Sequence, residues 1–315
     1  MKPSTDTKTL SKKRLILYIV ITFIITYLVE FAIIWPLANS ANPNLAIIAQ
    51  LLIAGVMFLP AIGVLITRLI TKEGFKNSYI KPKCGKKSIP YFLMGWFGPC
   101  ILTALGAVVY FCVYPERFDP QMGYLSSLIL AQGMEPTEQM VQITFISQAV
   151  TGVFLGAALN FANCFGEEWG WRGYLLPKML EHFKLIPTLL ISGVIWGLWH
   201  LPITMLGHNY GLGYSGYPFK GILAMCFFCI VIGCFFSYLT IRTGSCLPAA
   251  FAHGSLNGFA SIGLAFTHGG FSMTDGFDID PFVGPAPTGI LGGSAFIVCA
   301  IVVTILLLKR PGLKK

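Results

Sequence analysis

Long apolar runs repeat along this chain, and they limit the folds that it can adopt. Several of them exceed the roughly 20 residues that a helix needs to cross a bilayer. Only 11% of the residues are charged, whereas a water-soluble globular chain has about 25%. The chain therefore has too few charges to cover a surface that faces water. We predict an all-α membrane protein, a single bundle of about eight transmembrane helices in contact with the lipid bilayer.

The basic residues predict how this bundle is oriented. The runs that we interpret as spans are 15–38, 45–70, 91–114, about 140 into 167–172, 187–206, 221–241, 247–267 and 289–308. Eight spans place every basic segment on one side, which the positive-inside rule identifies as the cytoplasm. These segments are 1–14, 72–87, 172–186, 242 and the C-terminus. We therefore predict an integral protein of the plasma membrane with both termini in the cytoplasm and the loops at 115–139 and 268–288 outside.

Neither the net charge nor the cysteine content indicates a nucleic-acid partner or a set of disulfide bonds. The net charge of +9 follows from the basic cytoplasmic segments, so we expect no nucleic-acid partner. The nine cysteines lie mostly within apolar runs and indicate no disulfide framework. Glu30 lies inside the first span. It either lines an internal cavity, or it pairs with another group or extends towards the membrane surface.

One stretch at 163–177, NCFGEEWGWRGYLLP, places charged side chains beside hydrocarbon. A charge costs at least ~2.5–3.5 kcal/mol at the centre of a membrane helix, so such groups usually have a function. Glu168 and Arg172 are four residues apart with the acid first, which is the favourable order for an ion pair. Glu167 lies roughly 100° around the helix from Glu168. We therefore expect Arg172 to hold Glu168 and to leave Glu167 free for chemistry.

Two later spans also carry polar groups. Trp196 and His200 are four residues apart, as are His253 and Asn257, so each pair shares one face of a helix. Because hydrocarbon does not tolerate such groups, we expect them to converge with Glu167 on one interior cavity. A carboxylate can take a proton from water, while imidazoles and an amide can orient that water or stabilise an oxyanion. Taken singly, each histidine or asparagine has the alternative role of an interhelical hydrogen bond.

Other intramembrane hydrolases do not fit the sequence. It contains no H-E-x-x-H motif, which is the zinc-protease arrangement. All five aspartates lie outside the expected spans, which excludes an intramembrane aspartyl pair.

The order and spacing of these groups resemble the CPBP intramembrane proteases, which include type II CAAX prenyl endopeptidases and bacteriocin-immunity homologues. The resemblance covers roughly 160–260, while residues 1–140 match only in being membrane spans. We therefore divide the chain into three N-terminal spans, 1–140, and a catalytic core, 141–315. The matching motifs are E-E-x-x-x-R at 167–172, aromatic-x-x-x-His at 196–200, where the family usually has Phe and this chain has Trp, and H-x-x-x-N at 253–257.

The resemblance implies an endopeptidase that acts on a peptide or protein substrate, which reaches the site from the membrane or the cytoplasm. Glu167 and His200 would activate the water, and His253 and Asn257 would stabilise the oxyanion or help to hold a metal. A divalent ion such as zinc would bind through Glu167, His200 and His253, and a metal-free water activated by glutamate remains open as well. The supporting residues are Glu168, Arg172 and Trp196. The alternatives are a non-catalytic scaffold or immunity protein of the same family and a proton-coupled transporter.

The depths of two site residues constrain the geometry. His200 follows Pro187 by about thirteen residues, which is roughly 20 Å of helix, whereas Glu167 is expected near the cytoplasmic end of its span. They can meet only if the fourth helix ends deep in the membrane or the fifth begins outside it, near Glu181. We expect a water-filled conical cavity that opens to the cytoplasm.

Overall fold

The computed structural model describes residues 5–268, 271–272, 276–277 and 279–310 of the 315-residue chain. The elements of the first half are α1 (Thr5–Val29), η1 (Glu30–Ile34), α2 (Trp35–Ala38), α3 (Pro43–Val56), α4 (Leu59–Ile70), η2 (Gly85–Ser88), α5 (Ile89–Val113), η3 (Pro115–Arg117), α6 (Gly123–Ala131) and α7 (Glu138–Phe154). Those of the second half are α8 (Gly156–Leu159), α9 (Phe161–Gly170), η4 (Trp171–Leu175), α10 (Leu176–Leu180), α11 (Leu185–Trp199), α12 (Leu201–Thr204), α13 (Phe219–Thr243), α14 (Leu247–Phe259), η5 (Ile262–Phe266), β1 (Phe271–Ser272), β2 (Gly276–Phe277) and α15 (Ser294–Leu308). Within the described ranges β1 and β2 are the only strands; they pair antiparallel.

Helices fill the part of the protein that spans the membrane. Three helical stretches are long and apolar enough to cross a bilayer, Thr9–Ala38, Gly85–Val113 and Phe219–Thr243, and the pair α3–α4, bent by 45°, would make a fourth. α11 and α15 are apolar but have 15 residues each, or about 22 Å of helix. The all-α membrane architecture is therefore confirmed, and the count of eight spans stays a prediction.

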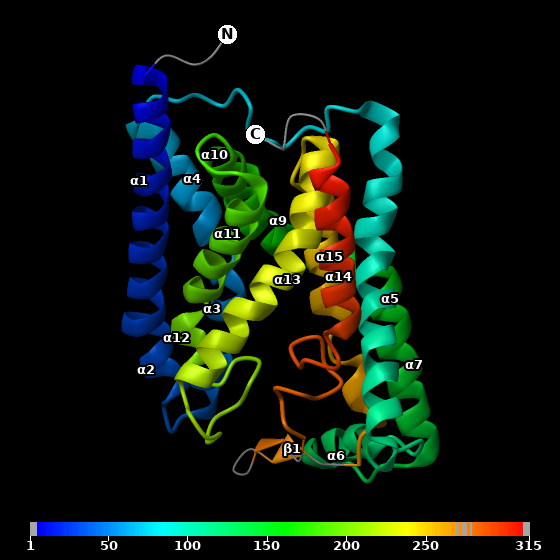
Figure 1. Cartoon of the computed structure of the whole chain (residues 1–315). Helices are drawn as coiled ribbons and strands as arrows, with labels where there is room; N and C mark the ends of the chain where they lie inside the picture. The colour runs from blue at the N-terminus through cyan, green and yellow to red at the C-terminus, as the bar shows by residue number, and fades with distance from the viewer. Residues whose placement is uncertain (1–4, 269–270, 273–275, 278, 311–315) are drawn as a thin grey trace.

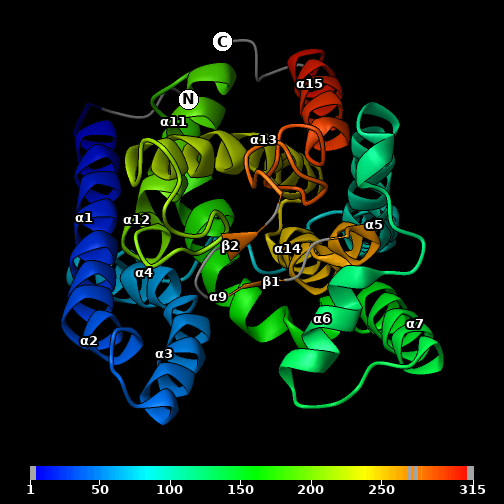
Figure 2. The same ribbon diagram turned by 90° about the horizontal axis from the view of Figure 1, so that it is seen from below.

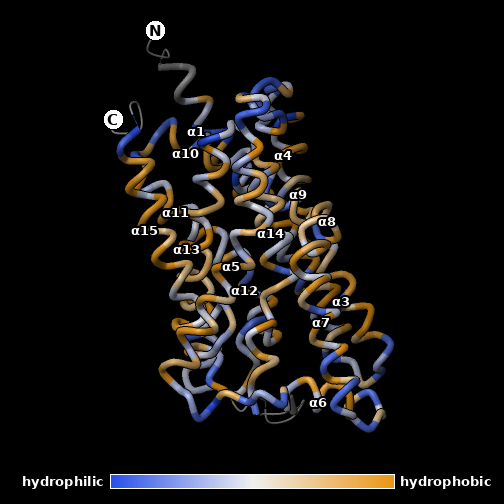
Figure 3. The backbone as a smooth tube through the Cα atoms, turned by 90° about the vertical axis from the view of Figure 1, so that its right-hand side faces the viewer, coloured by the Kyte–Doolittle hydropathy of each residue, from blue (hydrophilic) through white to orange (hydrophobic). Residues whose placement is uncertain are grey.

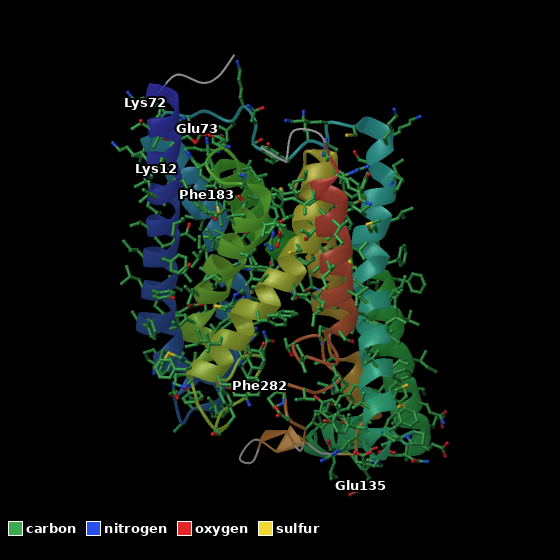
Figure 4. All side chains as sticks on the ribbon, in the orientation of Figure 1. Lys12, Lys72, Glu73, Glu135, Phe183 and Phe282 are labelled. Carbon is green, nitrogen blue, oxygen red and sulfur yellow. The ribbon has the colours of Figure 1, made fainter. Side chains whose placement is uncertain are left out.

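The bundle has two polar ends with a hydrophobic band between them (Figure 3). The start of α1, the end of α4 and the end of α15 lie at the same end (Figure 1). α2, α6, α12 and β1 lie at the other end, which faces the viewer in Figure 2. Figure 4 shows Lys12, Lys72 and Glu73 at the first end and Glu135 and Phe282 at the second.

The two ends differ in charge. We call the first the basic end; it consists of the start of α1, residues 68–88, 178–184 and 242–246, and the end of α15. We call the second the acidic end; it consists of residues 35–44, 114–138, 205–220 and the described part of 260–293. Among the described residues, the acidic end carries two basic side chains, Arg117 and Lys220, and the acids Glu116, Asp119, Glu135, Glu138 and Asp280. The described part of the predicted loop at 268–288 falls at this end, and Asp275 and Asp278 lie outside the described residues.

The second half of the chain supplies the centre of the bundle. α14 packs on α5, α8 and α9, and α13 packs on α11, α14 and α15. The pair α11–α13 is close because α11 carries two glycines at the contact. A Cβ at Gly193 or Gly197 would collide with the α13 backbone at Ile230 or Cys226 respectively. Small residues allow this approach between membrane helices, and it fixes the position of the end of α11.

The fourth predicted span differs from the expectation. It is broken after Phe154 into α7, α8 and α9, and its helical course then continues through η4 and α10 to Leu180. Pro177 does not end the helix, because it lies in the first turn of α10, where the missing N–H costs little. This continuation decides the depth of the acidic pair.

Candidate active site

A cavity of about 850 Å³ lies in the middle of the bundle, and we call it the central cavity. It is enclosed by α3, α9, the end of α11, α12, α13 and α14, together with residues 206–212 and 286–288. Its lining includes all four side chains to which we assigned the chemistry: Glu167, His200, His253 and Asn257. The convergence of three helices predicted from the sequence is therefore present.

Glu167 projects from α9 and is almost fully buried. Its Oε1 atom accepts hydrogen bonds from two indoles, Nε1 of Trp171 at 3.3 Å and Nε1 of Trp196. Both donors are fixed, because an indole has a single N–H and no acceptor. Two donors on one oxygen hold the carboxylate in a single orientation. Trp171 was not predicted as a site residue, although its position four residues after Glu167 is the signal that would have found it.

Glu168 follows Glu167 on α9 and is completely buried. Its Oε1 atom lies 3.1 Å from Nη1 of Arg172, which is the ion pair that the spacing predicts. The same oxygen lies 3.0 Å from Nδ1 of His253 on α14, a contact that the sequence did not reveal. The Arg172 guanidinium also stacks over the Trp196 ring, 4.0 Å from its centroid. Glu168 therefore connects the arginine to one of the two site histidines.

The two imidazoles are oriented in similar ways. Nδ1 of His200 lies 2.9 Å from the backbone oxygen of Trp196, and Nδ1 of His253 lies against Glu168. A carbonyl and a carboxylate can only accept, so Nδ1 is the donor in both rings, and Nε2 is left to the cavity. The Trp196 ring lies between them, with centroid distances of 5.8 Å to His200 and 5.6 Å to His253.

Three asparagines contribute amides to the cavity. Asn257 is exposed to it one turn after His253, and its Nδ2 lies 3.7 Å from Sγ of Cys164. Asn163 also lines the cavity and precedes Glu167 by four residues, a spacing that would have identified it. Asn160 donates instead to the backbone oxygen of Gly156 at 2.9 Å, which is a structural role. Asn257 and Asn163 are therefore the amides available to a bound substrate.

The depth of Glu167 is explained by the course of its helix. Because the chain stays helical to Leu180 and α11 begins at Leu185, Glu167 and His200 are both about fourteen residues from the turn that joins them. The two antiparallel segments therefore bring them to the same level. The fourth span was expected to end at 167–172, and that boundary is wrong, because the helical course continues to Leu180 and places Glu167 well before its end.

The central cavity extends to the acidic end. Its lining includes residues 206–212, where Leu212 is 62% exposed, and none of the lining residues belongs to the segments of the described chain that form the basic end. The ends of α1 and α15 that lead to the termini are at the basic end (Figure 1). Cytoplasmic termini and a cavity that opens to the cytoplasm, both expected from the sequence, therefore do not fit together, and the side that faces the cytoplasm stays a prediction.

The predicted metal ligands all line the central cavity. Within the described ranges no three His, Cys, Asp or Glu side chains are grouped closely enough to hold a metal ion. Each site histidine is bonded through one nitrogen to Trp196 or Glu168 and offers the other, which is the usual arrangement of a metal-binding imidazole. Glu167, His200 and His253 are therefore the residues that would hold a zinc ion, which would polarise the substrate carbonyl or the water, and this metal stays a prediction.

Glu30 does not belong to this site. It is fully buried in the π-helical turn η1, so it does not snorkel, and it does not line the central cavity. Neither of its carboxylate oxygens has a hydrogen-bond partner among the described residues.

The fold and this site define a class of protein: a helical membrane protein with a carboxylate, two imidazoles and an amide around one interior cavity. Residues 147–259, which contain all three motifs, match the family model described as type II CAAX prenyl endopeptidase Rce1-like. The chain is also similar to a CAAX prenyl protease 2 of Methanococcus maripaludis, with 22% identity over 194 residues. The aligned part covers 62% of this chain and 64% of that protein. The resemblance is thereby confirmed, and the matched segment is similar to a family of peptidases.

Proposed function

We propose that this protein is an intramembrane endopeptidase that hydrolyses a peptide bond in the central cavity. The observation that carries the proposal is the geometry of Glu167. One of its oxygens is fixed by Trp171 and Trp196, and the side chain lines the cavity opposite two imidazoles whose Nε2 atoms are free of protein partners in the described structure. A fixed carboxylate beside imidazoles in a buried site is suited to general base catalysis.

The reaction begins with a water molecule between Glu167 and Nε2 of His200. Glu167 takes one proton from this water, and the water oxygen attacks the carbonyl carbon of the scissile bond. Nδ2 of Asn257 and the Nε2 side of His253 stabilise the negative charge that develops on the carbonyl oxygen. When the C–N bond breaks, Glu167 returns the proton to the leaving nitrogen, which restores the enzyme. In this role His253 acts as the doubly protonated imidazole, which donates from Nε2 to the oxyanion while Glu168 accepts from Nδ1.

The remaining residues hold this geometry. Glu168 fixes the ring of His253 and neutralises Arg172, while Arg172 supports the face of Trp196. Removing one member of such a group leaves an uncompensated buried charge. We therefore assign Glu168, Arg172, Trp171 and Trp196 to positioning.

The orientation in the membrane follows the charges. We propose eight passes, with the basic end in the cytoplasm of the plasma membrane. The names of the matched family and relative refer to CAAX prenyl substrates, so a farnesylated CAAX peptide is a first candidate beside unmodified peptides.

The test is cleavage by purified protein, followed by mass spectrometry of a farnesylated CAAX peptide and a set of unmodified peptides. Glu167→Gln should abolish cleavage and leave the melting temperature unchanged, because the amide keeps the oxygen that accepts from the indoles but cannot take a proton. Glu135→Gln, an exposed residue at the acidic end (Figure 4), is the matched control and should cleave normally. Undiminished turnover by folded Glu167→Gln contradicts the assignment. A wild-type protein that cleaves nothing favours the scaffold, and one that carries protons instead favours the transporter.

A further inference from the structure

The central cavity is closed on the side of the basic end. Beyond Glu167, the helix continues with Trp171, Tyr174 and Leu175, which are all buried. The Trp171 ring meets Trp199 at 5.8 Å and Tyr18 at 6.1 Å between centroids. We call Tyr18, Trp171, Tyr174 and Trp199 the aromatic layer.

The aromatic layer is fastened to the basic end by polar contacts. Tyr18 and Tyr174 lie 5.0 Å apart between ring centroids, and the hydroxyl of Tyr174 donates to Glu73 at 2.7 Å. Glu73 also pairs with Lys178 at 2.7 Å. A substrate that approached from the basic end would have to displace these rings and break these contacts.

On the other side, the cavity meets a surface that a peptide can reach. Residues 206–209, 211–212 and 286–288 belong both to the cavity lining and to the acidic end. His208 and Asn209 are exposed there, as is Leu212. The open side of the cavity and the basic residues are therefore at opposite ends of the bundle.

The charge difference assigns these ends to the two sides of a membrane. Segments rich in Lys and Arg stay in the cytoplasm, and the described acidic end has Arg117 and Lys220 as its only basic side chains. We propose that the site takes a polypeptide segment on the non-cytoplasmic side of the membrane, next to the bilayer, of an exported or membrane-anchored protein. That the bound segment is cleaved rests on the proposed peptidase function. That it lies on the non-cytoplasmic side rests on the charges of the two ends and on the position of the cavity.

Two native cysteines make the side testable without any assay of activity. Cys84 is exposed at the basic end, and Cys112 is exposed in the last turn of α5. The first reporter is Cys112→Ser, which keeps Cys84. The second is Cys84→Ser/Cys112→Ser/Leu212→Cys, which places a thiol at the cavity mouth, and the same protein without Leu212→Cys is its background control. Thr288→Cys serves as a second mouth position if Leu212→Cys does not accumulate.

Intact cells are treated with a membrane-impermeant maleimide, before and after permeabilisation. We expect Leu212→Cys to be labelled from outside and Cys84 only after permeabilisation, with no labelling of the background control. Labelling of Cys84 from outside, or of the mouth cysteine only after permeabilisation, overturns the inference. Adding Glu167→Gln should not change the labelling, so this result does not depend on catalysis.

The second arm tests the substrate side directly. A single-span reporter carries a peptide that the purified enzyme cleaves, placed next to the span either outside or inside the cell. We expect cleavage of the outer version alone, and none with Glu167→Gln. Cleavage of the inner version alone, or of both, overturns the inference. If the mouth cysteine is labelled from outside but neither reporter is cleaved, the proposed substrate is wrong although the orientation is right. A protein that cleaves no peptide in solution contradicts the proposed function instead.

Discussion

Oε1 of Glu168 lies 3.0 Å from Nδ1 of His253 and 3.1 Å from Nη1 of Arg172. One buried carboxylate oxygen thus contacts both the imidazole of His253 and the guanidinium of Arg172, which come from different helices. The second acid of the pair is therefore connected to the chemistry through His253, as well as to the packing through Arg172.

This double contact predicts different losses of turnover in Glu168→Gln and Arg172→Gln. Glu168→Gln should lower both stability and turnover, because it removes the ion pair and the acceptor that orients His253. Arg172→Gln should lower stability by a similar amount, about 3–5 kcal/mol for a broken buried pair, but should reduce turnover less, since Glu168 still holds His253. Thermal unfolding in detergent and kcat for both variants provide the measurement. Equal losses of turnover in the two variants would show that the contact with His253 has no separate role.

Trp196 replaces the Phe that is usual in the family, and its indole donates to Glu167. Trp196→Phe should lower kcat roughly ten- to a hundredfold, because a hydrogen bond to a charged group is worth about 1.5–3 kcal/mol. Trp169→Phe is the matched control on α9, the helix that carries Glu167, since its indole donates to the backbone of Ser78 at 3.0 Å instead. The measurement is the kcat and KM of both variants by steady-state kinetics. A rise in KM alone for Trp196→Phe would indicate a role in substrate binding.

Asn257 and Asn160 differ in what their amides contact. Asn257→Ala should lower kcat by about 10²–10³, the usual effect of one lost oxyanion donor, with little change in melting temperature. Asn160→Ala should lower the melting temperature and leave kcat nearly unchanged, because Asn160 bonds to the backbone of Gly156 and lies near that of Gly254. The measurement is kcat beside the melting temperature. Normal kcat in Asn257→Ala would remove this residue from the proposed oxyanion site.

The contacts of Glu73 predict a pH dependence at the basic end. Burial raises the pKa of this carboxyl, but hydrogen bonds from Lys178 and Tyr174 outweigh it and hold the pKa below the ordinary value of 4.5. A group whose pKa is lower in the folded state stabilises the fold above the unfolded value, and this contribution is lost as pH falls through the folded value. The wild type should therefore melt above Glu73→Gln at pH 7, and the difference should shrink below about pH 4. A difference that grows on acidification would contradict this assignment.

The sequence predicted the groups of the site better than their arrangement. The spacing of Glu168 and Arg172, and of His253 and Asn257, is a property of any helix, so these relationships follow from residue numbers alone. The contact between Glu168 and His253 joins residues 85 positions apart, and it depends on how α9 and α14 pack. No local pattern encodes that packing.

The depth of Glu167 was predicted wrongly for a related reason. The sequence analysis ended the fourth span at 167–172, whereas the helical course continues to Leu180. Pro177 lies in the first turn of α10, where proline is compatible with the continuing helix. No local pattern in 163–177 distinguishes these two courses.

The aromatic layer has an electrical consequence. If water fills the central cavity as far as Glu167, the insulating part of the protein is reduced to the layer between this residue and the basic end. The membrane potential, worth about 2.3 kcal/mol per elementary charge and 100 mV, then falls across these rings rather than across the full bilayer. A proton that reaches Glu167 from the acidic end crosses little of that field, so the hydrolysis that we propose would take place at the voltage of the solution beside the acidic end.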